Sequence, residues 1–386
     1  MSEFRTIREL CSVVVDCPHS TPKWTANGKI VIRNKNIKHG KIDFSSPSYT
    51  DDEHFAQRIK RAKPQPGDII ITREAPIGDV GMIPENTECC LGQRMVLLRA
   101  NQSVCDNFYL LYSLQSLYVQ HQISWSEGTG TTVSNLRIPH LEQIQIPYLP
   151  LEQQAKISSV LRALEEKIEN NRRLNDNLLA QAQTLYKQHF PYSVQDELPD
   201  GWRIGTVGEI IEIHDSKRIP LSGADRMKME KKIYPYYGAA SLMDYVDNYI
   251  FDGKYLLLGE DGTVVDDAGY PILQYVWGQF WVNNHAHILT GRLGFNVESL
   301  YMLFKQTPVK SIVTGAVQPK ISQANLRSVQ VVIPPEHNLK EYNDLVEPLF
   351  SLLRANEEEC KSLAALRDTL LPKLMSGEID VSDIQL

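Results

Sequence analysis

An apolar stripe with heptad spacing is the feature of this sequence that most constrains its fold. Between residues 151 and 190 the stripe alternates intervals of three and four residues, at Ile157, Leu161, Leu164, Ile168, Asn171, Asn175, Leu178, Ala182 and Leu185. The same stripe recurs 185 positions later, at Val346, Leu349, Leu353, Asn356, Leu363 and Leu370. This spacing predicts two long helices that bury one narrow seam against each other. Two helices that pack separately as core elements are the alternative.

The two helices are predicted to pair as an antiparallel coiled coil. A helix of about 40 residues is roughly 60 Å long, whereas a linker of about ten residues spans at most about 36 Å. So short a linker does not return the chain to the start of the first helix. Asn171 and Asn356 occupy equivalent positions in the middle of the seam. We expect their amides to fix the register, as single polar residues do in coiled coils.

The repeat extends beyond the helices into the segments that precede them. Residues 130–150 and 315–335 each contain an alternating apolar run that ends at a proline, Pro150 or Pro335. Such a run predicts a strand that stops where the helix begins. The chain is therefore predicted to be an α+β tandem duplication. We divide it into mixed α/β domains at 1–150 and 201–335, helices at 151–190 and 336–376, a linker at 191–200 and a mobile acidic tail at 377–386.

The distribution of charge is more informative than the net charge of -7. Residues 336–386 hold 11 acidic and 5 basic residues, so much of the acidity lies on the second helix and tail. Clusters of cations in the globular domains, such as Lys29 to Lys41, are what a phosphate backbone attracts, although solvated faces carry similar clusters. The six cysteines have no CxxC spacing and are expected to be free thiols. With no long apolar run or leader, the chain is expected to be cytoplasmic, without a membrane partner.

Motifs of catalysis and cofactor binding are missing from the sequence. It contains no GxxxxGK[ST] or GxGxxG loop, no GxSxG elbow and no HExxH. His285 and His287 would face the same side of a strand, but no third metal ligand accompanies them at a suitable spacing. Glu260 and Asp261 lack the neighbouring lysine of a nuclease motif. We expect no catalytic residues, no metal site and no cofactor in this chain.

Several motifs resemble the specificity subunits of type I restriction-modification systems. The segment IPYLPLEQQAKI (residues 146–157) is similar to that family's junction of recognition domain and conserved helix. GDIIITR (67–73) resembles its GD-apolar-S/T-R element, and IRNKNI (32–37) with GKID (40–43) resembles a recurrent element of its target-recognition domains. The second copy departs at residues 336–338 and places Pro348 inside its helix. The resemblance spans the whole chain.

The resemblance implies a non-catalytic subunit that recognises double-stranded DNA. Each target-recognition domain would read one half of a bipartite, asymmetric site, and the paired helices would separate the two domains. Two methyltransferase subunits would carry S-adenosylmethionine, and motor-nuclease subunits would use ATP and Mg. The exposed residues Arg172 and Arg173 are expected to dock a companion subunit.

The chemistry of DNA contacts selects candidate residues within the two domains. Phosphates attract exposed cations, and we expect them to contact Lys23, Lys35, Lys38, Lys60, Arg61, Lys217, Arg218 and Lys320. Base edges are read by amides, guanidinium groups, hydroxyls and similar side chains. For this role we select Arg33, Asn36, Gln93, Arg94, Thr131, Tyr237, Asp261, Asn283, Asn284 and His285. Arg33 and Asn36 have the alternative role of holding a loop.

Two other classes of protein fit the sequence less well. The chain could be the recognition half of another fused or split restriction-modification enzyme, but it lacks an NPPY-type catalytic motif. It could also be a coiled-coil scaffold whose domains bind sugar or protein instead of DNA. Binding of duplex DNA in the presence of the methyltransferase distinguishes these classes from a specificity subunit.

Overall fold

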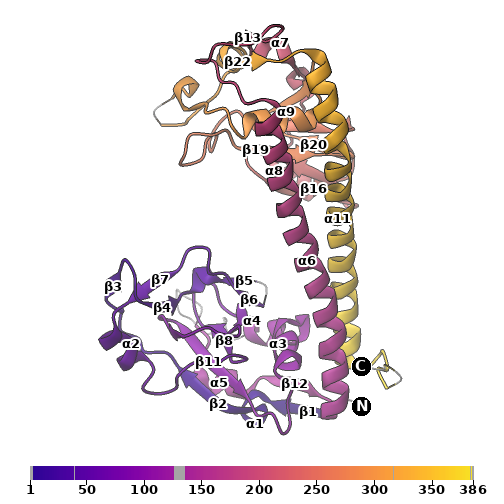
Figure 1. Cartoon of the computed structure of the whole chain (residues 1–386). Helices are drawn as coiled ribbons and strands as arrows, with labels where there is room; N and C mark the ends of the chain where they lie inside the picture. The colour runs from indigo at the N-terminus through magenta and orange to yellow at the C-terminus, as the bar shows by residue number, and fades with distance from the viewer. Residues whose placement is uncertain (1–2, 39, 126–134, 316, 383, 385–386) are drawn as a thin grey trace. The chain divides into compact units, whose positions relative to one another are not determined.

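A computed structural model of the chain describes residues 3–38, 40–125, 135–315, 317–382 and 384 (Figure 1). Contacts divide the chain into two compact units: unit 1 comprises residues 1–170 and 359–386, and unit 2 comprises residues 171–358. Each long helix therefore contributes one segment to each unit. This division differs from the expected one, in which every helix is a separate part, because each helical segment packs on the globular domain beside it.

Unit 1 contains a four-stranded antiparallel sheet in the order β2-β11-β8-β9 and a second sheet in the order β10-β4-β7-β3. Small ribbons, β1-β12 and β5-β6, complete it. The elements before the long helix are β1 (Glu3–Thr6), α1 (Ile7–Leu10), β2 (Cys11–Asp16), β3 (Trp24–Thr25), β4 (Lys29–Ile32), η1 (Asn34–Asn36), β5 (Ile37–Lys38), β6 (Lys41–Ile42), β7 (Ser48–Thr50), α2 (Asp52–Arg58), β8 (Ile69–Thr72), β9 (Val80–Met82), β10 (Cys89–Leu91), β11 (Met95–Ala100), α3 (Asn107–Gln115), α4 (Leu117–Trp125), α5 (Ile138–Gln143) and β12 (Gln145–Tyr148).

Unit 2 repeats this plan with sheets in the orders β14-β21-β18-β19 and β16-β15-β20-β17, and with the ribbon β13-β22. Its globular elements are β13 (Arg203–Thr206), α7 (Val207–Ile210), β14 (Ile211–Ile213), η3 (Asp215–Lys217), α8 (Gly223–Met227), β15 (Tyr234–Tyr237), β16 (Leu242–Val246), β17 (Phe251–Asp252), β18 (Tyr255–Gly259), β19 (Leu273–Val276), β20 (Gln279–Val282), β21 (Ala286–Gly291), α9 (Val297–Phe304), η4 (Lys310–Ile312), α10 (Gln323–Ser328) and β22 (Gln330–Ile333). The predicted mixed α/β class is confirmed for both domains.

The first helix of each unit begins with the same local signal. In α1 the backbone N–H of Thr6 donates to the Glu9 carboxylate at 2.7 Å, and the Thr6 hydroxyl accepts from the Glu9 backbone N–H at 3.3 Å. Thr206 and Glu209 form the equivalent capping box in α7. A capping box satisfies two backbone donors that a helix start otherwise leaves unpaired. This is why the Thr-x-x-Glu spacing recurs in both copies.

The segment from Asn107 to Trp125 is divided between two helices. Helix α3 ends at Gln115, and Ser116 adopts an extended conformation with ψ near 146°. The Ser116 hydroxyl donates to the carbonyl of Ser113 at 2.6 Å, and α4 begins at Leu117. A serine that bonds to nearby backbone groups competes with the helix in this way.

The long helices are α6 (Leu151–His189) and α11 (Glu336–Ser376) (Figure 1). In unit 2 the Tyr342 hydroxyl donates to the carbonyl of Ala182 at 3.1 Å, and Asn356 contacts Asn175. Residue numbers rise along one helix as they fall along the other, so the pairing is antiparallel. In unit 1 the Cys360 thiol lies 3.7 Å from the carbonyl of Ile168. The predicted antiparallel pairing is confirmed.

The amide that pairs with Asn356 is not the predicted one. Asn356 Nδ2 donates to Asn175 Oδ1 at 2.8 Å, and Asn175 lies one turn beyond Asn171. Asn171 is itself buried, with 3 % exposed. Antiparallel helices bring equivalent residues of a repeat together only at their symmetry point. The equivalence of Asn171 and Asn356 in the sequence therefore does not make them partners.

Helix α11 continues through Pro348 without interruption. Proline removes one backbone hydrogen bond from a helix. Val346 and Phe350, on either side of it, are 0 % and 1 % exposed and belong to the core of unit 2. Burial of the seam at these positions offsets the lost bond.

The described part of the tail packs against unit 1. Val381 is 3 % exposed and packs in the core of unit 1 with Leu374 and Met375. The carbonyl of Ser382 accepts a hydrogen bond from Lys156 Nζ at 2.8 Å. The tail is acidic overall, but its apolar residues are spaced so that they reach the core.

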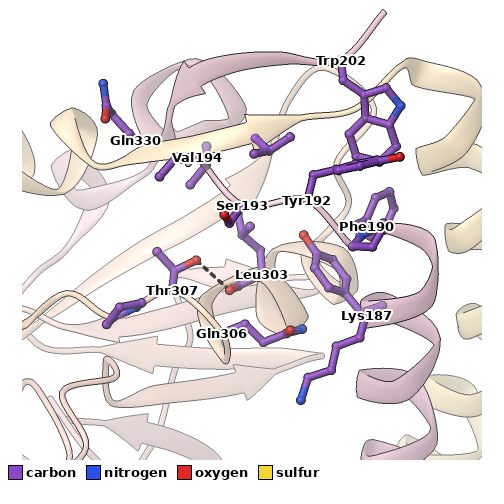
Figure 2. Close-up of a pocket in the computed structure, with 15 residues that line it drawn as sticks. Lys187, Phe190, Tyr192, Ser193, Val194, Trp202, Leu303, Gln306, Thr307 and Gln330 are labelled. Atoms are coloured by element: carbon purple, nitrogen blue, oxygen red, sulfur yellow. Dashed lines mark hydrogen bonds between the residues drawn. The ribbon is translucent and has the colours of Figure 1, made fainter. Parts of the chain in front are cut away.

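Aromatic side chains hold the linker against the second domain. Tyr192 and Trp202 meet with ring centroids 5.0 Å apart, and Phe190 lies 6.2 Å from Trp202 (Figure 2). A cavity of about 370 Å³ lies between this cluster and the segment that follows α9. The linker is thus part of the packing of unit 2.

All six cysteines are buried free thiols, as expected. Burial raises the pKa of the Cys11 thiol to about 12. Among the described helices, none has an apolar stretch long enough to span a membrane.

Candidate functional site

The candidate base-reading residues of unit 1 gather where two parallel strands end. Strands β4 and β10 pair in parallel, with Ile32 opposite Leu91. The backbone N–H of Gly92 donates to the carbonyl of Ile32 at 2.7 Å and holds the two outgoing loops together. Arg33 follows β4, and Gln93 with Arg94 follows β10. All three line one cavity of about 250 Å³.

The candidate residues of unit 2 occupy the same place in the fold. Strands β15 and β20 pair in parallel, with Tyr237 opposite Val282. The backbone N–H of Asn283 donates to the carbonyl of Tyr237 at 3.0 Å, as Gly92 does to Ile32. Asn284 and His285 follow directly in the chain. In each unit, the structure thus places these candidates at the carboxyl end of a parallel strand pair.

Two of the amides selected as base readers hold loops instead. Asn36 is 4 % exposed. Its Oδ1 accepts from the backbone N–H of Arg33 at 3.0 Å, and its Nδ2 donates to the carbonyl of Asp43 at 2.9 Å. Asn283, also 4 % exposed, accepts from the backbone N–H of His285 at 2.8 Å. Both are corrections, because a buried amide whose groups are already paired does not reach a base edge.

Three further base candidates have partners within their own unit. Gln93 donates to the carbonyl of His19 and to the hydroxyl of Thr21. Arg94 forms an ion pair with Glu74 at 3.1 Å, and 56 % of its side chain stays exposed. Tyr237 packs edge-on against Phe280, and burial raises the pKa of its hydroxyl to about 12. Thr131 lies outside the described residues.

Most of the cations selected for phosphate contact are exposed. Lys60, Arg61 and Lys217 are exposed side chains. Lys23 forms an ion pair with Asp51 at 3.5 Å, and Lys38 forms one with Asp43 at 2.9 Å; both remain mostly exposed. Exposed pairs of this kind contribute little to stability and exchange readily for a phosphate. Lys35 donates to the neutral hydroxyl of Ser46 at 3.1 Å.

Arg218 belongs to a buried network and not to the phosphate-binding surface. Its side chain is 14 % exposed and forms ion pairs with Glu260 at 2.6 Å and Asp215 at 3.3 Å. It also donates to the carbonyl of Ala286 at 2.8 Å. Its neighbour Lys217 points to solvent because η3 turns the two side chains in different directions. The assignment of Arg218 to phosphate is therefore corrected.

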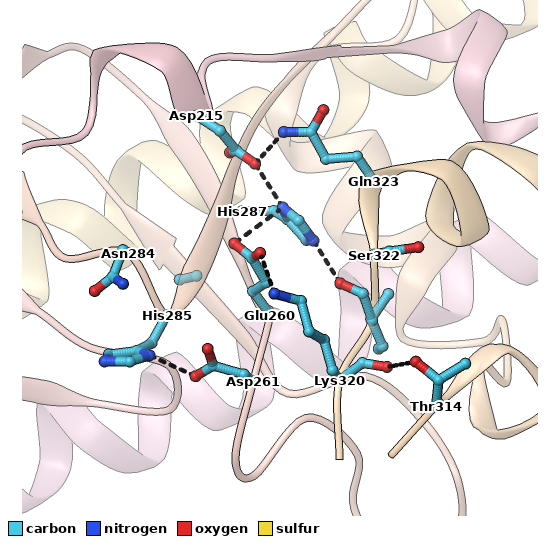
Figure 3. Close-up of polar contacts among 12 residues, drawn as sticks. Asp215, Glu260, Asp261, Asn284, His285, His287, Thr314, Lys320, Ser322 and Gln323 are labelled. Atoms are coloured by element: carbon cyan, nitrogen blue, oxygen red, sulfur yellow. Dashed lines mark hydrogen bonds and ion pairs between the residues drawn. The ribbon is translucent and has the colours of Figure 1, made fainter. Parts of the chain in front are cut away.

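The same network holds Asp215, Glu260 and His287, whose ligand atoms lie within 4.8 Å of one another. His287 Nε2 lies 2.8 Å from the carbonyl of Ile321, and Nδ1 lies 2.6 Å from Asp215 (Figure 3). The imidazole is therefore held by two hydrogen-bond acceptors, one on each ring nitrogen.

The two carboxylates of the network are kept ionised by their partners. Burial alone would raise the pKa of Asp215, but hydrogen bonds from His287 and the backbone of Ile288, with the charges of His287 and Arg218, lower it. For Glu260 the penalty of burial is likewise exceeded by Arg218, His287 and Lys320, and its pKa is lowered. Lys320 lies 3.2 Å from Glu260 with 49 % of its side chain exposed. Arg218 and Lys320 therefore place positive charge beside the buried acids.

Asp261 and His285 form an ion pair beside this network (Figure 3). His285 keeps 45 % of its side chain exposed, whereas Asp261 keeps 18 %. Asn284, which precedes His285 in the chain, is exposed. Asn284 and His285 are therefore the candidates of unit 2 that remain accessible to a base.

Sequence reasoning missed Trp24, which lines the same cavity as Arg33. The ring is 44 % exposed, and the Arg33 guanidinium lies over it, 5.0 Å from its centroid. The position of this tryptophan next to Lys23, a candidate for phosphate contact, was a usable signal. Its contact with Arg33, which follows a different strand, was not visible in the sequence.

The docking candidates Arg172 and Arg173 are exposed on α6. They follow Asn171, whose side chain is buried. The sequence therefore placed them correctly on the outer face of the helix. Leu174, 40 % exposed, adds apolar surface next to them.

Two copies of one mixed α/β domain, each followed by a long helix, define a tandemly duplicated two-domain protein. Comparison with known families is specific. The family model described as "Type I restriction modification DNA specificity domain" matches residues 3–180 and 199–364. The chain belongs to this family of type I restriction-modification specificity subunits.

Individual relatives cover nearly the whole chain. The "Type I restriction enzyme MjaIX specificity subunit" of Methanocaldococcus jannaschii is 24% identical over 350 residues, covering 82% of this chain and 79% of that protein. The "Putative type I restriction enzyme MjaX specificity subunit" of the same organism is 21% identical over 98% of this chain and 94% of its own length. A crystal structure of a type I S subunit from M. genitalium shares the fold, with a TM-score of 0.55, 20% identity and coverage of 96% and 95%.

Proposed function

We propose that this chain reads a bipartite, asymmetric site in double-stranded DNA, with one half-site bound by each domain. The observation that carries the proposal is the equivalent placement of two different sets of side chains. The carboxyl end of the parallel strand pair presents guanidinium groups in unit 1 and an amide with an imidazole in unit 2. Two unlike readers on the same scaffold suit a site whose halves differ in sequence.

Catalysis is assigned to partner subunits that act with this chain in the cytoplasm. Methyltransferase subunits would supply S-adenosylmethionine, and motor-nuclease subunits would supply the ATP and Mg chemistry. Support comes from family membership and from the chemistry of the charged cluster in unit 2, where positive side chains neutralise the acids. The chain contributes sequence recognition and a helical surface for assembly.

The test is salt-dependent binding of duplex DNA by the chain together with its methyltransferase subunits. We expect a specific duplex, identified by mapping methylated positions in the host genome, to bind at least about a thousandfold more tightly than a scrambled duplex. The logarithm of the affinity should fall linearly with the logarithm of the salt concentration, because lysines and arginines displace counterions. The chain alone should transfer no methyl group. Equal affinity for both duplexes would contradict the proposal.

Charge reversal at Arg172 and Arg173 should weaken assembly with the methyltransferase. Replacing both with glutamate turns two favourable contacts into like-charge contacts if the companion surface is acidic, and we expect a loss of roughly tenfold or more in affinity. Analytical ultracentrifugation with increasing methyltransferase measures the dissociation constant.

Lys340→Glu is the matched control for this prediction. Lys340 is exposed on α11 and also changes from positive to negative. If the control and the double variant lower the affinity equally, the effect is one of net charge. If neither lowers it, the docking face lies elsewhere on the helices.

A further inference from the structure

Trp24 and Arg33 form a preorganised pair at the mouth of the unit 1 cavity. Strand β3, which starts at Trp24, pairs with β7, and β7 pairs with β4, after which Arg33 follows. The sheet therefore fixes the positions of the two strands from which the indole and the guanidinium project. Stacking on an aromatic ring restricts an arginine to orientations parallel to the ring. In the structure the guanidinium lies over the exposed indole, 5.0 Å from the ring centroid.

The guanidinium of Arg33 keeps its donors available. Across the described ranges of the chain, the Arg33 side chain makes neither an ion pair nor a hydrogen bond to protein, and its contact is the indole ring. This contrasts with Arg94, which pairs with Glu74, and with Arg73, which pairs with Asp16 at 2.8 Å. Arginine carries five N–H donors in a planar fork. A stacked fork with free donors is suited to bidentate recognition of two acceptors in one plane.

The cavity next to this pair is positive. Its lining residues include Arg33, Lys35 and Arg94 and no carboxylate. Lys35 and Arg94 lie at the surface with partners in Ser46 and Glu74, whereas Arg33 contacts only the indole ring among the described residues. A volume of about 250 Å³ accommodates the edge of a base pair but is smaller than a typical small-molecule pocket. The geometry favours one planar group with two acceptors.

We propose that Arg33 is a specificity-determining residue that reads a guanine in the half-site of the first domain, and that Trp24 is its positioning residue. The O6 and N7 acceptors of guanine in the major groove match the arginine fork, and this is the commonest specific contact of arginine with DNA. The inference rests on the proposed function, since it requires that the domain bind DNA. It adds the identity of one base and of the residue that reads it.

The experiment compares wild-type and variant complexes, each with the methyltransferase, on duplexes of the mapped site. Each guanine of the first half-site is replaced in turn by 7-deazaguanine, which lacks the N7 acceptor. For wild type we expect one guanine at which the replacement weakens binding on the order of tenfold, and a base-pair change there should weaken it up to about a hundredfold. On the natural site, Arg33→Ala should bind more weakly than wild type by a factor similar to that of the base-pair change. Its affinity should no longer change when 7-deazaguanine replaces that guanine.

Two conservative variants separate base reading from phosphate contact. Arg33→Lys keeps the positive charge but loses the fork, so it should resemble Arg33→Ala if a base is read and wild type if a phosphate is bound. Trp24→Ala should reduce discrimination at the same guanine, and Trp24→Phe should restore part of it. Lys60→Ala is the control: Lys60 is exposed and does not line the cavity. It should weaken all sequences alike and reduce the salt slope by about one.

Each outcome decides the matter. Three results would each overturn the inference and leave the proposed function intact. They are equal weakening of all sequences by Arg33→Ala, wild-type behaviour of Arg33→Lys, and a first half-site that contains no guanine. Wild-type complex that binds specific and scrambled duplexes equally would overturn the proposed function itself. Both substituted side chains are exposed, so unchanged thermal unfolding of the variants checks that the fold is preserved.

Discussion

Matched insertions of four residues in the two long helices should lengthen the gap between the half-sites by one or two base pairs. The insertions follow Asn170 in α6 and Glu358 in α11, where both helices pass from one unit to the other. Four residues add about 6 Å along a helix and rotate it by only about 40°. DNA rises about 3.4 Å per base pair. Each recognition domain keeps its own helical segments, so the half-site sequences should not change.

Both helices must be lengthened together, because α6 and α11 contact each other within each unit. An insertion after Gln181 in α6 alone would separate two contacts of unit 2, Asn175 with Asn356 and Ala182 with Tyr342. We expect that variant to lose assembly or activity instead of shifting the gap. Four residues inserted in the linker after Glu197, which is exposed, lengthen no helix and should leave the gap unchanged. Mapping methylated sites for the three variants gives the answer, and an unchanged gap in the matched variant would mean that the helices do not set the spacing.

Glu298→Ala should destabilise unit 2 by about 3 kcal/mol, because it breaks a buried ion-pair network. Glu298 is 0 % exposed on α9. Its Oε1 lies 2.7 Å from Lys254 Nζ and 3.4 Å from Arg354, and it accepts from the Tyr275 hydroxyl at 2.7 Å. Arg354 lies on α11, so this carboxylate joins the second domain to the helix of its own unit. Removing it leaves positive charge in a partly buried place.

Hydrogen exchange in peptides of α9 and β19 measures the loss of stability locally. Glu298→Gln preserves the shape and an acceptor for Tyr275, and it should cost less than the alanine variant. Glu341→Ala removes an exposed acid from α11 and should change the free energy of unfolding by less than about 0.5 kcal/mol. A cost below about 1 kcal/mol for Glu298→Ala would show that Glu347, which lies 2.8 Å from Arg354, compensates for the missing carboxylate.

The sequence by itself determined the duplication and its elements. The heptad stripe predicted α6 and α11, and proline-closed runs predicted β12 and β22, because these signals depend on the spacing of neighbouring residues. The Thr-x-x-Glu boxes recur for the same reason. Placing Arg172 and Arg173 outside the seam also needed only the helical period. Features that depend only on the spacing of neighbouring residues could therefore be predicted without the tertiary structure.

Only the tertiary structure decided which side chains are free to bind. Lys217 and Arg218 are neighbours in the sequence, yet Arg218 forms an ion pair with Glu260, 42 residues away. Asn36 and Asn283 resembled base readers but pair with their own loops. The role that we propose for Arg33 depends on its contact with Trp24, which lies on a different strand. Residues distant in the chain determine whether a side chain is buried and which partners it has. Whether a charged or amide side chain can bind a ligand therefore depends more on these neighbours than on its residue type.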